Sequence, residues 1–237
     1  MAHQLNEFKA QIDALVTNGM EQEEALYKVL KETIIASKNI RFEGDGYSEE
    51  WKKEAEGRGL TNICHVPEAI MRFNDPQSRS VLIGEKVFNE NELNCRIEVE
   101  LEKYTKKIQI ESRVLGDMAI NHIVPTAVIY QNRLLENLRG LRETFSTEEY
   151  EYLGAERREL VKEIQLHTME IKKLVREMTN ARHIANRLSS QVEKAYSYQD
   201  SVSPYMEKIR EHIDDLEMEI DDEIWPLPKY RELLFTK

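Results

Sequence analysis

The sequence predicts an all-α protein, in which short helices precede a long antiparallel, coiled-coil-like helical hairpin with a third helix packed on it. Three observations favour this class. Only 9 Gly and 6 Pro occur among 237 residues, too few for the many turns of a β-sandwich. Apolar residues recur at helical spacing along most of the chain. A heptad pattern in the C-terminal half is typical of helices that wind around one another.

The first 88 residues are predicted to form a region of short helices. Each expected helix joins an apolar stripe to a start or stop signal in the sequence. The expected helices are residues 3–18, which end before Gly19, residues 21–37, residues 49–58 after the N-cap Ser48, and residues 67–73, which Pro67 opens. Residues 77–88 are expected to be irregular or to form one more short helix.

Residues 89–237 are predicted to form the long hairpin. Asn89 and Glu92 have the spacing of a capping box, so a long helix is expected to begin there. Pro125 removes one backbone hydrogen bond, but apolar residues at helical spacing on both sides predict a kink and not an end. Ser146 and Glu149 form a second capping-box signal, which predicts that the chain reverses just before them.

A heptad pattern defines the expected packing seam of the hairpin. Apolar residues step by 4 and 3 from Leu160 to Ala195, which predicts one continuous helix over five heptads. The seam is assigned to Leu160, Ile164, Ile171, Leu174, Met178 and Leu188, packed against the helix that contains residues 93–129. Ser203-Pro204 is expected to start the last helix. Pro226 and Pro228 are expected to stop it, which leaves an aromatic-rich tail, Trp225 to Phe235.

Charge and cysteine content exclude several classes of protein. The chain has 33 basic and 44 acidic residues and a net charge of −11, which opposes binding to nucleic acid or to an anionic membrane surface. No apolar run approaches the about 20 residues that span a bilayer. Two cysteines, Cys64 and Cys95, cannot build a disulfide framework, and no signal-peptide pattern follows Met1. We therefore expect a cytoplasmic protein.

No catalytic, cofactor-binding or metal-binding residue is assigned from the sequence. The common phosphate-loop, nucleophile-elbow and zinc motifs are missing from it. Gly44-Asp45-Gly46 before a helix start could hold an anion, but the surrounding acidic residues favour a capped turn. Cys64-His65 is interpreted as a free thiol beside a histidine, because no third catalytic group follows at a recognisable spacing.

Two histidines and an acidic run have competing interpretations. His122 and His167 lie on apolar seams, where a polar residue sets helix register more often than it binds a metal. The acidic side chains between Asp214 and Glu223 lack the spacing of a calcium loop, so they are interpreted as a solvated helix face. These patterns alone indicate a structural or interaction module.

Four segments resemble the C-terminal region of type III glutamine synthetases, the large form of the ATP-dependent glutamate–ammonia ligase. They are FEGDGYSEEWKKEAEGRGL (42–60), VFNENELNCRIEVELEKYTKKIQIES (87–112), IVPTAVIYQ (123–131) and DDEIWPLPKYRELLF (221–235). The GDGYS-EEW segment and the terminal WPLP-Y-LLF segment are the most specific. The four segments follow one another in family order and together span most of the chain.

The resemblance implies a non-catalytic C-terminal domain. In this family the residues that bind ATP, glutamate, ammonium and Mg²⁺ lie on an upstream catalytic barrel, and none of their motifs matches a position here. Residues 1–88 are then expected to pack on that barrel, and the hairpin of residues 89–237 to pack against neighbouring subunits. The alternative is an independent coiled-coil adaptor that binds another protein along its acidic faces.

Overall fold

The computed structural model describes the backbone of residues 2–234 and the side chains of residues 3–229 and 232–234. Within this part the chain is all-α and contains no β-strand. It divides into two compact units, residues 1–97 and residues 98–237. The division falls inside helix α6 (Glu90–Met118), later than the 88–89 boundary that the sequence favours.

The first unit contains the short helices that the sequence predicts. Helices α1 and α2 pack against each other, and Gly19, with a φ of +91°, makes the turn between them because glycine adopts this conformation without strain. The segment 77–88, which the sequence leaves either irregular or helical, is helical up to Gly84 as part of helix α5. The helices are α1 (Ala2–Thr17), α2 (Gln22–Ala36), α3 (Glu49–Gly57), α4 (Val66–Met71) and α5 (Pro76–Gly84).

Side-chain caps fix where several helices begin. Asn89 Oδ1 accepts from the Glu92 backbone N–H at 2.9 Å, and the Glu92 carboxylate accepts from the Asn89 N–H at 2.8 Å. Ser146 and Glu149 form a second reciprocal box at the start of α8. Each box satisfies amide groups that have no partner inside the helix. Both capping boxes predicted from the sequence are confirmed.

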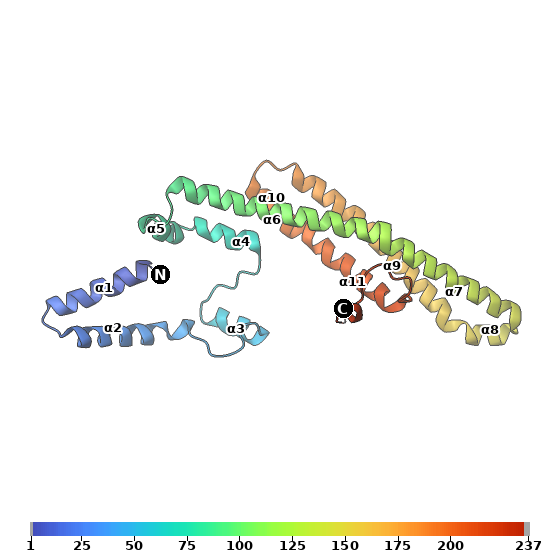
Figure 1. Cartoon of the computed structure of the whole chain (residues 1–237), viewed down its shortest axis with the longest axis horizontal. Coiled ribbons are helices and arrows are strands. Elements are labelled where there is room, and N and C mark those ends of the chain that lie inside the picture. The colour runs from blue at the N-terminus through green and yellow to red at the C-terminus, as the bar shows by residue number, and fades with distance from the viewer. Residues whose placement is uncertain (1, 235–237) are drawn as a thin grey trace. The chain divides into compact units, whose positions relative to one another are not determined.

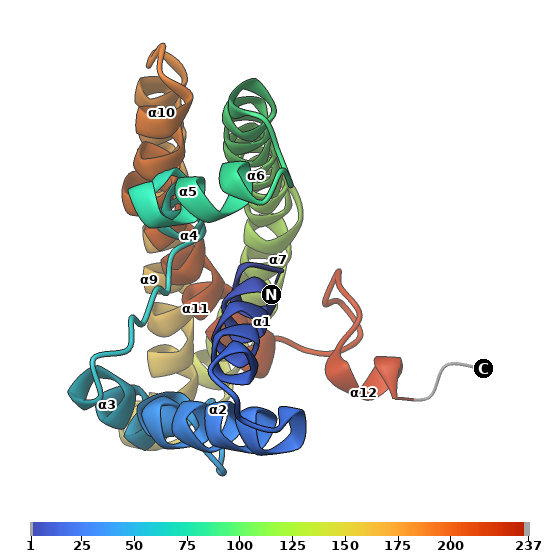
Figure 2. The same cartoon turned by 90° about the vertical axis from the view of Figure 1, so that its left-hand side faces the viewer.

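The second unit is built around helix α9 (Ala155–Asn186), which packs on α7 (Val124–Thr144) and on α11 (Ser203–Glu219). Figure 1 shows α7 and α9 joined through the short helix α8 (Thr147–Leu153), and both Figure 1 and Figure 2 show α11 alongside α9. The fully buried core includes Ala119, Ile123, Ala127, Ile164, Ile171, Ala185, Tyr198, Val202, Ile209 and Leu216. The predicted hairpin with a third helix is confirmed.

The long helix continues through Pro125, as the sequence predicts. A π-helical turn, Ala119–Ile123, immediately precedes α7, and the Val124 N–H donates to the Ala119 carbonyl. The wider turn makes room where the proline ring would otherwise clash with the preceding turn. The Thr126 hydroxyl donates to the His122 carbonyl at 2.8 Å and supplies a donor next to the proline, which has none.

The prediction of one continuous heptad helix from Leu160 to Ala195 is wrong. Helix α9 ends at Asn186, residues 187–190 reverse the chain, and α10 (Gln191–Ser197) begins after the N-cap Ser190, whose hydroxyl accepts from the Glu193 N–H. Apolar spacing continues across the turn because α10 carries an apolar stripe of its own, so the pattern alone does not reveal the break. Leu188 lies in the turn and is only partly buried.

The third helix therefore begins earlier than the sequence predicts. Helix α10 passes through a second π-helical turn, Tyr198–Val202, directly into α11, so Ser203-Pro204 lies inside a continuous helical segment. Both prolines within these long helices thus follow a π turn at the same distance, and both π turns contact α9. Helix α11 ends at Glu219, before Pro226, and a last short helix is α12 (Tyr230–Leu233).

Candidate interaction site

The predicted packing seam occupies the side of α9 that faces the core. Ile164 and Ile171 are fully buried, Leu174 and Met178 nearly so, and Leu160 packs on the core while partly exposed. Their partners come from α11 as well as from α7, so the seam serves two helices and not only the one that precedes it. Leu188 is the exception, because it lies beyond the end of α9.

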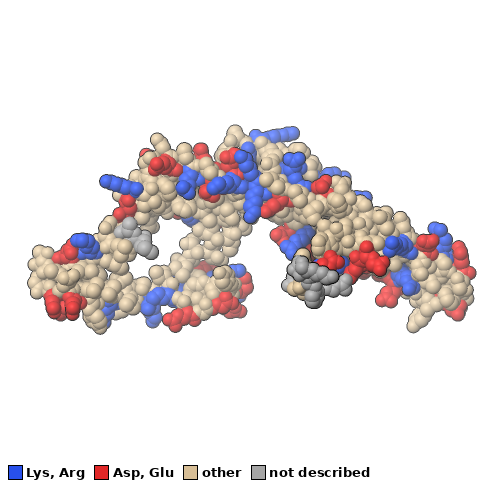
Figure 3. Space-filling model, viewed as in Figure 1, with Lys and Arg blue, Asp and Glu red and all other residues tan. Residues whose placement is uncertain are grey.

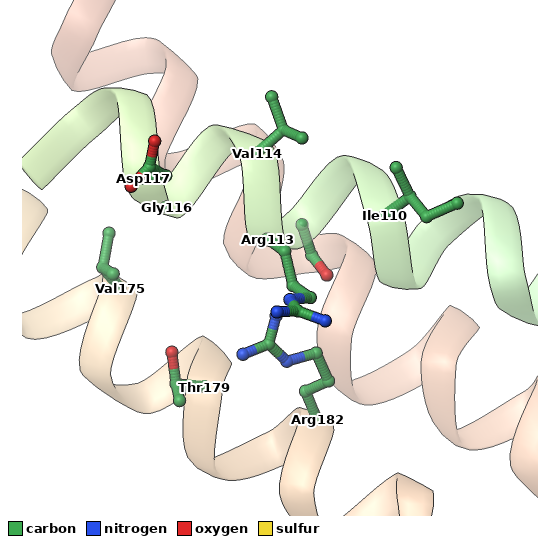
Figure 4. A pocket seen from close by; sticks show the side chains of 9 residues that line it. Ile110, Arg113, Val114, Gly116, Asp117, Val175, Thr179 and Arg182 are labelled. Carbon is green, nitrogen blue, oxygen red and sulfur yellow. The ribbon is translucent and has the colours of Figure 1, made fainter. Parts of the chain in front are cut away.

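A groove of about 630 Å³ lies between α6 and α9 in the second unit. Figure 4 shows the Arg113 and Arg182 side chains entering it from opposite walls, with their guanidinium groups facing each other. The helices approach closely at buried Gly116, where a Cβ would lie 3.4 Å from the Val175 Cγ1. The groove is lined by Ile110, Ser112, Arg113, Val114, Gly116, Asp117, Val175, Thr179 and Arg182.

The two arginines of this groove repel each other. Burial, followed by the charge of Arg113, lowers the pKa of the Arg182 guanidinium. Neither arginine makes an ion pair within the described part of the chain, and the nearby Asp117 accepts instead from the Asn121 amide at 2.6 Å. Two planar cations without a counter-ion can bind a carboxylate or a phosphate group. Sequence reasoning missed this pair, since its members lie 69 positions apart on different helices.

The GDGYS-EEW segment builds a capped turn in the first unit. The Phe42 ring stacks on the Trp51 ring with 3.9 Å between centroids, and it lies across Gly44, where a Cβ would be 2.6 Å from the Phe42 Cζ. Asp45 accepts from the Tyr47 N–H at 2.9 Å, and Ser48 accepts from the Trp51 N–H at 3.1 Å. These contacts support the capped-turn interpretation of the glycine pair.

Helix α2 carries an apolar stripe that the described chain leaves open. Leu26, Leu30 and Ile34 follow at four-residue intervals on one face, and their exposed fractions are 45%, 44% and 52%. Only Ala25 and Val29 of this helix are buried. Single exposed apolar residues are normal on a protein surface, but a contiguous patch of them marks a contact surface.

The remaining sequence candidates lie in separate places. Cys64 and Cys95 are exposed free thiols. His122 is exposed, whereas His167 contacts His212 across the α9–α11 interface. Acidic and basic side chains are interspersed on the face shown in Figure 3, and most ion pairs join residues three or four apart on one helix. Among the described helices, none has both the length and the apolar content needed to cross a membrane.

The terminal WPLP-Y-LLF segment contributes to the core of the second unit. Trp225 is 8% exposed and joins the buried cluster with Ile220. The Lys229 ammonium lies over the Trp225 ring and donates to the Glu217 carbonyl at 2.7 Å, which holds the segment against the end of α11. Phe235 lies outside the described residues.

Comparisons with known proteins identify the chain's relatives. A sequence model described as the glutamine synthetase C-terminal domain matches residues 25–142. The chain is 68% identical over its full length to a glutamine synthetase of Bacteroides fragilis, of which it covers 32%. It is 29% identical over 219 residues to a type-3 glutamine synthetase of Dictyostelium discoideum, with 90% of the chain and 29% of that protein aligned.

The third relative is a glutamine synthetase of Butyrivibrio fibrisolvens, 27% identical over 219 residues that cover 92% of the chain and 31% of the relative. The chain thus spans about a third of the length of the curated relatives it matches. Three of the four family-like segments lie within the matched residues 25–142, and the fourth, residues 221–235, lies beyond them. The chain belongs to the glutamine synthetase family, of which it represents the C-terminal domain.

Proposed function

We propose that this chain is a non-catalytic helical domain that holds a type III glutamine synthetase together. The parent reaction would be the ATP-dependent ligation of ammonia to glutamate, with ATP and Mg²⁺ bound outside this chain. The observation that carries the proposal is the open apolar stripe of α2, Leu26, Leu30 and Ile34. In a domain that spans about a third of its relatives' length, such a stripe fits a contact with the rest of the protein.

The first unit would supply the contact with the catalytic barrel. Its helices are short and bury few apolar side chains, while the α2 stripe faces outward. Burial of a Leu or Ile side chain contributes about 1.5–3 kcal/mol, so three such residues are enough to anchor a domain within one polypeptide. The occupant we assign to this face is therefore the catalytic part of the same enzyme.

The second unit would supply a contact between subunits. The Arg113 and Arg182 guanidinium groups face each other in a groove, and neither pairs with a carboxylate in the part of the chain that the structure describes. An acidic side chain of a neighbouring subunit would relieve their repulsion and could accept from both arginines.

We also propose that the enzyme is cytoplasmic, a location that suits two exposed free thiols.

The α2 contact is tested in the full-length enzyme. Leu30→Gln combined with Ile34→Gln should weaken packing on the barrel, lower the midpoint of thermal inactivation and shift the assembly towards smaller species in analytical ultracentrifugation. The matched control is Lys28→Gln together with Glu32→Gln, two polar changes on the same helix. An unchanged assembly and inactivation midpoint in the apolar double variant would contradict the proposal.

The subunit contact and the lack of catalysis have separate tests. Arg113→Gln with Arg182→Gln should lower the oligomeric state of the full-length enzyme at physiological salt, with Arg176→Gln on α9 as control.

The chain alone, supplied with ATP, Mg²⁺, glutamate and ammonium, should form no glutamine above a blank without protein. Turnover that copurifies with the homogeneous chain would show that it is catalytic.

A further inference from the structure

Two histidines and an aspartate converge between α9 and α11, away from the arginine groove. His167 on α9 and His212 on α11 approach with their Nδ1 atoms 3.0 Å apart, and Asp215 Oδ2 lies 3.8 Å from the His167 Nδ1. One donor atom from each of the three side chains lies within 4.8 Å of the others. His212 and Asp215 are three positions apart on one helix, so both face His167.

These distances suit a metal ion. Zn²⁺ binds histidine nitrogen and carboxylate oxygen at about 2.0–2.2 Å, and a tetrahedral arrangement then separates neighbouring donor atoms by about 3.3 Å. The observed separations of 3.0 Å and 3.8 Å bracket this value. Without an ion, one Nδ1 must donate to the other. With an ion, both rings carry their proton on Nε2 and direct the Nδ1 lone pair at the metal.

The surrounding charge also favours a cation. Glu219 lies four residues beyond Asp215 on α11, and its Oε2 atom is buried without a hydrogen-bond partner among the described residues. Burial, followed by the charges of Glu163 and Asp215, raises the pKa of the Glu219 carboxyl. No ion pair with a lysine or arginine balances Glu163, Asp215 or Glu219 in the described part of the chain. A bound cation would reduce this accumulation of negative charge.

We propose that His167, His212 and Asp215 form a binding site for one divalent transition-metal ion, of the Zn²⁺ type, that cross-links α9 to α11. The residues supply two imidazole nitrogens and one carboxylate oxygen, a donor set that suits Zn²⁺ better than Mg²⁺, which prefers oxygen ligands. Three protein ligands leave a fourth position for water. This inference does not depend on the proposed function.

The first experiment measures Zn²⁺ binding to the chain without a histidine tag. The chain is treated with chelator, dialysed and titrated with ZnCl₂ in a calorimeter. The proposal expects one saturable site per chain, and a melting temperature that rises with Zn²⁺ because the ion binds only where the two helices are folded together. No saturable binding, or displacement of Zn²⁺ by an equal concentration of Mg²⁺, would overturn it.

Matched variants locate the site. His212→Ala should weaken Zn²⁺ binding by more than about 100-fold, which exceeds the effect of removing an outer-shell partner. Asp215→Asn, at an exposed position outside the buried core, should weaken it by about tenfold or more. His183→Ala removes an exposed histidine from the same helix α9 and should bind as the parent does.

Circular dichroism establishes that each variant remains helical before it is titrated. Co²⁺ in place of Zn²⁺ gives an independent readout, because a tetrahedral site produces strong visible absorption that should vanish in His212→Ala and persist in His183→Ala. Equal affinity in His212→Ala and the parent chain would assign the two rings to a simple imidazole hydrogen bond. That result, too, would overturn the proposal.

Discussion

Tyr198 donates its phenolic hydroxyl to Asn186 Oδ1 over 2.8 Å. Tyr198 lies fully buried in the second π turn, and Asn186 is the last residue of α9, so this bond closes the turn at residues 187–190. The same Asn186 oxygen accepts from the Gln109 amide of α6 at 3.3 Å. The Asn186 side chain thus joins the end of α9 to the second π turn and to α6.

Removal of the Tyr198 hydroxyl should destabilise this end of the unit. Tyr198→Phe keeps the ring in the core but leaves Asn186 with one donor fewer, and a net cost of about 0.5–1.5 kcal/mol is expected. Urea unfolding followed by circular dichroism measures the change. Tyr196→Phe, two residues away and without a hydroxyl contact among the described residues, serves as control. A larger loss in the control than in Tyr198→Phe would refute the assigned role.

Buried tyrosines should make the chain sensitive to alkali. Burial raises the pKa of the Tyr198 hydroxyl above its usual value of 10.0, an effect that Arg182 and the Asn186 hydrogen bond partly oppose. Burial also raises the pKa of Tyr104. Because the folded pKa exceeds the unfolded one, the stabilisation is complete below pH 10.0 and is lost as pH rises through the folded pKa.

The measurement is the free energy of unfolding across this alkaline range. The parent chain should lose stability as the pH rises above about 10, and Tyr198→Phe should show a shallower decline because it lacks one of the two groups. Equal slopes in the parent and in the variant would show that the pKa of Tyr198 is the same in the folded and the unfolded chain.

The core face of α9 should be costly to truncate. Ile171 is fully buried among residues of α7 and α11, so Ile171→Ala is expected to cost about 2–5 kcal/mol from lost burial and the cavity left behind. Met169→Ala, at a position 54% exposed on the same helix, should change stability by less than about 0.5 kcal/mol. Equal unfolding midpoints for the two variants would contradict the assigned seam.

The hydroxyl of Thr126 should matter for the helix at Pro125. Thr126→Val keeps the shape of the side chain but removes the donor to the His122 carbonyl, and a cost of about 1 kcal/mol is expected. Thr126→Ser keeps the donor and should recover part of the loss. Thermal unfolding compares the two. A serine variant less stable than the valine variant would show that the methyl group matters more than the hydrogen bond.

Local sequence patterns are enough to predict the all-α class, the capping boxes at Asn89 and Ser146, and the continuity of the helix through Pro125. These features depend on interactions within a few residues of the chain, such as a side chain that reaches a nearby amide. Family membership was visible in the same way, since the GDGYS-EEW turn needs Gly44 beside the Phe42 ring.

Packing between helices sets where α9 ends and which distant side chains meet. The heptad pattern ran past residue 186 because α10 carries its own apolar stripe, and periodicity records a buried face without recording which helix it belongs to. The meetings of Arg113 with Arg182 and of His167 with His212 join different helices. Such pairs depend on the packing and rotation of whole helices, which no local pattern of residues specifies.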